Sequence, residues 1–190
     1  ESLTNSERLI SIDKIFDVTT KPLIFDGDTG GQIDHLDMKI KSMERLGVSA
    51  AIFEDKTGLK QNSLFQNTSN QKQEDKNKFA EKILTLPSIK SLGIISHGFN
   101  TNRALRTLPK IYLACKKKGV LFHISISLDG YNKIHDEVRQ IPNGFSKTMS
   151  TINSICSNPS KYCDSFDIGC TVVNQNVYHL VELEAFVKSK

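Results

Sequence analysis

Acidic side chains follow two apolar segments in the first half of the sequence. One segment leads into Asp26-Gly27-Asp28, and the next apolar segment along the chain leads into Glu54. Side chains two residues apart on extended backbone project to the same side, so Asp26 and Asp28 are expected to point together. Carboxylates this close repel each other unless a cation neutralises them, and hard oxygen ligands favour Mg²⁺. The pattern predicts a cation site at the ends of these segments.

The residues around these carboxylates suit an anionic ligand. Gly30 and Gly31 lack a Cβ, so the backbone there can approach a ligand closely. Taken separately, the DGDTG and EDK sequences are also typical of a turn and of a solvated loop. Their placement after neighbouring apolar segments favours a site for a phosphorylated or carboxylated small molecule. The polar side chains that could bind it are those of Lys56, Lys60, Asn62 and Ser63.

A second group of polar residues follows an apolar segment in the other half. Ser127 and Asp129 share one face of the predicted strand 120–128, and Arg139 comes shortly after. A guanidinium group can bind a carboxylate through two parallel hydrogen bonds. From spacing alone, an ordinary βα unit with His135 and Arg139 on its surface explains the same residues.

Hydrophobic periodicity predicts alternating strands and helices. Strands are expected at 22–26, 48–53, 92–96, 120–128 and 166–173, and helices at 3–16, 33–46, 74–84, 101–118, 144–156 and 177–187. Strands separated by helices, without hairpin signals, predict the α/β class with parallel βα units. A complete (βα)₈ barrel takes about 250 residues, so these strands cannot close one.

Composition excludes several classes of protein. The chain has 190 residues, a net charge of +4 and 38% hydrophobic residues, which is ordinary for a globular protein and argues against disorder. The sequence contains no run of about 18 apolar residues, so no membrane span is predicted. The basic triplet 116–118 precedes Gly119, which suits the end of a helix, so nucleic-acid binding is not expected. The sequence leaves the oligomeric state open, with a homo-oligomer as one alternative.

The two halves of the sequence differ in charge and in cysteine content. Residues 1–83 carry a net charge of −2 and residues 84–190 a net charge of +6, and all four cysteines lie in the second part. The cysteine spacing matches neither a zinc pair nor an iron–sulfur loop. Free thiols in a reducing compartment are expected, which predicts a cytoplasmic protein. Because the sequence starts at Glu1 inside an amphipathic pattern, a piece of a longer chain is expected.

The first part resembles a known family. The segments VTTKPLIFDGDTGG and MERLGVSAAIFEDKTGLKQNSLF resemble the phosphoenolpyruvate phosphomutase family of the isocitrate lyase superfamily, over about residues 1–83. The resemblance implies an α/β-barrel isomerase that uses Mg²⁺ to form a P–C bond, converting phosphoenolpyruvate to phosphonopyruvate. It also implies that Mg²⁺ is organised by Asp26, Asp28 and Glu54.

The same resemblance assigns a gating loop. Lys60, Asn62 and Ser63 would lie on a loop that closes over the phosphoryl group and excludes water. The isocitrate lyase signature Lys-Lys-Cys-Gly-His is absent. The family's essential aspartate is expected before Glu1, and its later strands do not follow Ile83. Turnover by this chain alone is therefore not expected.

The second part resembles a different family. The segments IISHGFNTN, HISISLDGYNKIHDEVRQIPNGFSKTMSTINSI and DIGCTVVNQNV resemble the middle of a radical S-adenosylmethionine enzyme barrel, over about residues 86–190. The resemblance implies that Ser127, Asp129 and Arg139 help to position S-adenosylmethionine. The CxxxCxxC loop that binds the 4Fe–4S cluster is absent, so radical chemistry is not predicted.

Three hypotheses follow for the two expected domains, 1–83 and 84–190, each read as an incomplete TIM-barrel-like piece. The chain is a phosphomutase-type enzyme or a fragment of one, which is the favoured interpretation. Alternatively, it belongs to a radical S-adenosylmethionine enzyme. The third hypothesis is a non-catalytic fusion or fragment.

Overall fold

The structure is a computed structural model that describes residues 5–28, 33–55 and 75–189. The chain forms two compact units, residues 1–88 and residues 89–190. In the described ranges, strands alternate with helices, and every strand pairing is parallel. The predicted α/β class with parallel sheets is confirmed. The sequence predicts a division after Ile83, and the structure divides after Ser88.

Unit 1 contains a small parallel sheet. Strands β1 and β2 pair in register, with Asp26 beside Ile52 at the carboxyl ends. The predicted helix 33–46 begins as a 3₁₀ turn and continues as an α-helix. The elements are α1 (Asn5–Phe16), β1 (Ile24–Asp26), η1 (Ile33–His35), α2 (Leu36–Arg45), β2 (Ala50–Ile52) and α3 (Lys76–Ile83).

The core of unit 1 comes mainly from its helices. Apolar side chains of α1, α2 and α3 are buried, and α2 contacts α3. An ion pair of 3.9 Å between Lys82 Nζ and Asp37 Oδ1 lies alongside this helix contact. The helices therefore supply the packing that supports the short strands. The buried apolar residues are Ile12, Leu36, Met43, Ala80, Ile83, Leu84 and Leu86.

Unit 2 contains a three-stranded parallel sheet in the order β3-β4-β5. The sequence patterns predicted each of its strands but missed the short helix α5. The elements are β3 (Ser91–Ser96), α4 (Thr101–Lys118), β4 (Leu121–Ser127), α5 (Lys133–Arg139), α6 (Gly144–Cys156), η2 (Pro159–Lys161), β5 (Ser165–Gly169), η3 (Val177–His179) and α7 (Leu180–Lys188).

The helix α4 has the predicted bounds because both of its ends are set locally. The Asn100 side chain accepts a hydrogen bond of 2.9 Å from the backbone N–H of Arg103, which caps the first turn. Gly119 ends the helix in the left-handed conformation, with φ +67, as a C-terminal glycine does. The basic triplet occupies the last turn, where cations favour the helix dipole.

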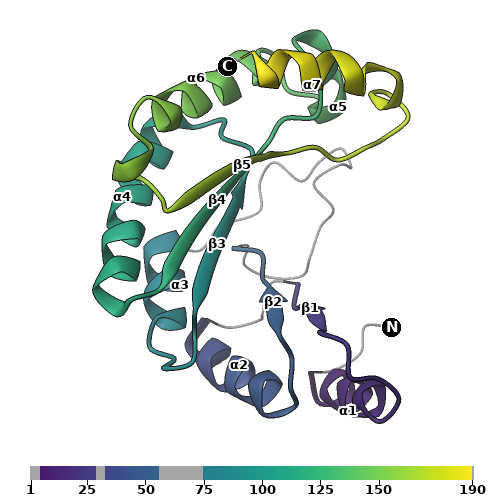
Figure 1. Cartoon of the computed structure of the whole chain (residues 1–190), viewed down its shortest axis with the longest axis vertical. Coiled ribbons are helices and arrows are strands. Elements are labelled where there is room, and N and C mark those ends of the chain that lie inside the picture. The colour runs from purple at the N-terminus through teal and green to yellow at the C-terminus, as the bar shows by residue number, and fades with distance from the viewer. Residues whose placement is uncertain (1–4, 29–32, 56–74, 190) are drawn as a thin grey trace. The chain divides into compact units, whose positions relative to one another are not determined.

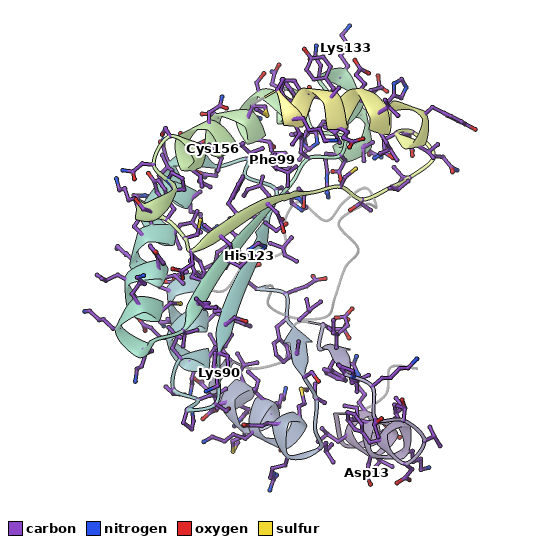
Figure 2. All side chains as sticks on the ribbon, in the orientation of Figure 1. Asp13, Lys90, Phe99, His123, Lys133 and Cys156 are labelled. Atoms are coloured by element: carbon purple, nitrogen blue, oxygen red, sulfur yellow. The ribbon has the colours of Figure 1, made fainter. Side chains whose placement is uncertain are left out.

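The two faces of the unit 2 sheet differ in character. Phe122, Ile124 and Ile126 of β4 are buried on the face that α4 and α6 cover (Figure 1). The alternate residues of β4, among them His123, lie on the opposite face (Figure 2). Parallel sheets are normally covered on both faces. In the described part of unit 2, helices cover one face of the sheet, the face that carries Phe122, Ile124 and Ile126. No helix in the described ranges is long and apolar enough to span a bilayer.

Truncating a buried side chain of β4 is predicted to lower the free energy of unfolding more than truncating an exposed one. Phe122 is 0% exposed and its neighbour Leu121 is 63% exposed. We expect Phe122→Ala to lower the free energy of unfolding by about 3–5 kcal/mol, because it leaves a cavity. We expect Leu121→Ala, the matched control, to change it by less than about 0.5 kcal/mol. Urea unfolding followed by circular dichroism measures both, and equal losses would contradict this layering.

Candidate functional site

The first candidate site lies at the carboxyl end of β1. The strand ends at Asp26, and the backbone N–H of Asp28 donates a hydrogen bond of 3.0 Å to Asp26 Oδ1. Asp28 is in the left-handed region, with φ +51. The expected extended backbone through Asp28 is therefore wrong, because the Asp26 side chain folds the chain into a turn.

Backbone hydrogen bonds bring the end of β2 to this turn. Gly27 N–H donates to Ile52 O at 2.8 Å, and Glu54 N–H donates to Asp28 O at 2.6 Å. A Cβ at Gly27 would lie 2.1 Å from Cε1 of the Phe53 ring, so a larger residue here would force that ring to move. Three of the predicted acidic positions, Asp26, Asp28 and Glu54, are thus neighbours in the structure.

An arginine from α1 binds the same turn. Arg8 Nη1 donates to Asp28 Oδ2 at 3.0 Å, and Arg8 Nη2 donates to Asp26 O at 2.6 Å. The guanidinium carbon lies 4.8 Å from the centroid of the Phe25 ring. Sequence analysis missed Arg8, since nothing in its local sequence points to a partner about 20 residues away.

The donor chemistry of this turn suits Mg²⁺. Carboxylate oxygens are ligands that Mg²⁺ prefers. Within the described ranges, however, no three His, Cys, Asp or Glu side chains are placed to hold a metal ion. The Asp28 carboxylate is directed to Arg8 instead.

The remaining predicted residues of unit 1 divide into two sets. Asp55, which follows Glu54, forms an ion pair of 2.5 Å with Lys76 of α3 and so ties the end of β2 to that helix. The loop residues that were predicted to bind an anion lie outside the described residues. These are Gly30, Gly31, Lys56, Lys60, Asn62 and Ser63.

The second candidate site lies after β4 in unit 2. The structure brings Asp129 and Arg139 together, with Arg139 Nε donating to Asp129 Oδ2. The backbone N–H of Thr171 donates to the other carboxylate oxygen at 2.8 Å. The Asp129 side chain is 0% exposed and that of Arg139 is 7% exposed. Ser127 lies at the end of β4, two residues before Asp129.

Asn176 completes this network, and sequence analysis missed it. Its Nδ2 donates to Asp129 O at 2.7 Å and to Thr171 O at 2.8 Å. Its Oδ1 accepts from Val173 N–H at 2.8 Å. The turn-forming spacing from Val173 to Asn176 was the available local signal, but it does not identify Asp129 as a partner. Asn176 joins the loops that follow β4 and β5.

His135 is a buried neutral member of the same network. Its Nδ1 accepts from Asp129 N–H at 3.0 Å, so the ring proton is on Nε2. Nε2 lies 3.3 Å from Thr148 Oγ1, which donates to His97 O at 2.8 Å. The interpretation of His135 and Arg139 as surface residues is wrong, because both side chains are inside unit 2.

The buried imidazole predicts a pH-dependent stability. Burial lowers the pKa of His135 from 6.5, with Arg139 adding to this and Asp129 and Asp136 opposing it. The unfolded chain then binds more protons, so the contribution of His135 is full above about pH 6.5 and falls as the pH drops. We expect the wild type to lose more unfolding free energy than His135→Asn between about pH 7 and pH 5.

Urea unfolding at a series of pH values measures this difference. In His135→Asn, the side-chain oxygen can accept from Asp129 N–H but does not titrate. Because the other histidines are present in both proteins, the difference between the two pH profiles isolates His135. Parallel profiles would contradict the buried neutral histidine.

The open face of the unit 2 sheet carries a further polar cluster. His123 Nδ1 lies 2.8 Å from Ser165 Oγ, and His123 Nε2 lies 3.0 Å from Asp167 Oδ2. The three residues join β4 to β5 across the sheet. Spacing gave no signal for this cluster, because the partners are more than 40 residues from His123. The imidazole is held between a hydroxyl group and a carboxylate.

The four cysteines are free thiols in the structure. Cys115 and Cys163 are buried, whereas Cys156 and Cys170 are exposed. Burial, with a smaller effect of Asp164, raises the pKa of Cys115 to about 11, so this thiol is not a ready metal ligand.

Comparisons with known proteins support a relationship for the first part of the chain. Residues 1–89, a little under half of the chain, match the family model described as phosphoenolpyruvate phosphomutase. The solved phosphoenolpyruvate phosphomutase from Streptomyces platensis subsp. rosaceus is similar at 15% identity and a TM-score of 0.49. The match covers 98% of this chain and 65% of that one, so the chain spans about two thirds of that protein's length. No curated protein matches the chain significantly. The comparisons give no support to the radical S-adenosylmethionine resemblance.

Proposed function

We propose that residues 1–89 form a phosphomutase-type site that binds a small phosphorylated or carboxylated acid together with Mg²⁺. The family match over these residues carries the proposal. The activity proposed for the intact site is the isomerisation of phosphoenolpyruvate to phosphonopyruvate. The neighbouring positions of Asp26, Asp28 and Glu54 support a role for these residues as the metal ligands.

The proposed roles divide between the strand ends and the loop. The strand-end carboxylates are proposed to hold Mg²⁺. When bound, Mg²⁺ would neutralise the negative charge of the substrate's phosphoryl oxygens. Lys60, Asn62 and Ser63 are proposed to close over the phosphoryl group. Exclusion of water matters because a loose, metaphosphate-like phosphoryl group would otherwise hydrolyse.

Binding, rather than turnover, tests the residues of this chain directly. We expect isothermal titration calorimetry to detect oxalate, a dianionic probe, only when Mg²⁺ is present. We expect Asp28→Asn to weaken this binding by at least about tenfold, or about 1.4 kcal/mol. Asparagine tolerates the left-handed conformation of Asp28, so the substitution removes the charge while retaining the turn.

Asp13→Asn is the matched control, because Asp13 is an exposed aspartate on α1. It should leave oxalate binding unchanged. Oxalate binding without Mg²⁺, or binding that survives Asp28→Asn, would contradict the proposed site.

A second candidate function concerns unit 2. We propose S-adenosylmethionine as a ligand of the site formed by Ser127, Asp129 and Arg139. The supporting observation is that Asp129 uses one donor of a nearly buried guanidinium, Nε, which leaves four N–H donors directed elsewhere. In this proposal Asp129 orients Arg139, and Arg139 binds the ligand carboxylate.

Iron–sulfur chemistry is not proposed for this chain. Anaerobic incubation with iron and sulfide should give no stoichiometric visible absorbance from a cluster, because the four cysteines do not come from one loop. A variant carrying Cys156→Ala and Cys170→Ala is the control for adventitious iron at the exposed thiols. A stable cluster that persists in this variant would contradict the expectation, whereas absorbance that the variant loses comes from iron at the exposed thiols. Absence of oxalate binding would favour a non-catalytic fragment.

A further inference from the structure

Arg8 stands out because, among the described residues, it brings a positive charge to the turn where a metal is proposed. It approaches from α1, outside the strands and loops that carry the predicted site residues. Two nitrogens of one guanidinium bind two different acceptors there, the Asp28 carboxylate at 3.0 Å and the Asp26 carbonyl at 2.6 Å. The Phe25 ring lies beneath the guanidinium. Arg8 is thus held at this turn by three separate contacts.

The turn is shaped so that Asp28 meets this cation. Asp28 adopts a left-handed backbone conformation that non-glycine residues rarely take, and the Asp26 side chain stabilises it. The carbonyl of Asp28 is bonded to Glu54 N–H. The backbone of Asp28 is therefore fixed, while its carboxylate is 40% exposed and can exchange partners.

We infer that Arg8 is a resident counter-cation of the carboxylate turn, and that a divalent cation and Arg8 compete for Asp28. The inference rests on the proposed metal site at Asp26, Asp28 and Glu54. A guanidinium and a divalent cation within a few ångströms of one carboxylate repel each other. Release of Arg8 from Asp28 is then the step that makes the turn competent to bind metal, and it loosens α1.

The first test is a Mn²⁺ titration of the full chain, with free Mn²⁺ measured by electron paramagnetic resonance. We expect Arg8→Gln to bind Mn²⁺ about tenfold more tightly than the wild type, which lies within the usual range of coupling between two sites. Arg45→Gln is the matched control, because Arg45 lies on α2 of the same unit and its guanidinium contacts Ser42. It should bind Mn²⁺ as the wild type does.

The second test needs no substitution, so it does not depend on how Arg8→Gln folds. Competition is reciprocal, so saturating Mg²⁺ should increase hydrogen exchange of the amides in Asn5–Phe16 of the wild type. Exchange in α4, which belongs to unit 2, should not change. Unchanged or slower exchange in α1 at saturating Mg²⁺ would overturn the inference.

The outcomes separate this inference from the proposed function. Equal or weaker Mn²⁺ binding by Arg8→Gln, in a protein whose wild type binds Mn²⁺, overturns the competition and leaves the metal site standing. Absence of Mn²⁺ binding in both proteins overturns the metal site, and the inference with it. Tighter binding by Arg8→Gln together with faster exchange in α1 supports both.

Discussion

In each unit, an arginine binds an aspartate that follows a parallel strand. Asp28 follows β1 and binds Arg8, whereas Asp129 follows β4 and binds Arg139. The carboxyl ends of parallel strands gather polar side chains at one edge, where ligands also bind in this class of fold. The rest of each candidate site is arranged around these two pairs. A ligand at either site must work with an arginine already bound to the aspartate.

Burial makes the two pairs different in kind. The Arg8–Asp28 pair is partly exposed, and such pairs contribute about 0–1 kcal/mol to stability. The Arg139–Asp129 pair is buried, and loss of one partner from such a pair costs about 3–5 kcal/mol. Asp129 also accepts from Thr171, and its backbone holds Asn176 and His135. The first pair can therefore exchange its cation, whereas the second is part of what holds unit 2 together.

Elements whose signals are local could be predicted from the sequence. Both ends of α4 depend on residues beside them, Asn100 and Gly119, and the helix has its predicted bounds. The apolar pattern predicted a strand at 120–128, and β4 spans Leu121–Ser127. The helix α5 was missed because its seven residues are too few to show a helical period. The 3₁₀ starts of two predicted helices were missed for the same reason.

The positions of the candidate sites could be predicted from the sequence, but the binding partners of their side chains could not. Strand ends follow from hydrophobic patterns, so Asp26, Glu54 and Asp129 could be placed after strands. Their partners depend on which elements the fold brings together, and a single sequence does not encode the distance from Arg8 to Asp28 in any local pattern. The assumption of extended backbone failed at Asp28 because a side-chain hydrogen bond outweighed the strand geometry there. The position of a carboxylate at a strand end therefore does not suffice to assign it as a metal ligand. The cation that already binds it in the folded chain must also be known.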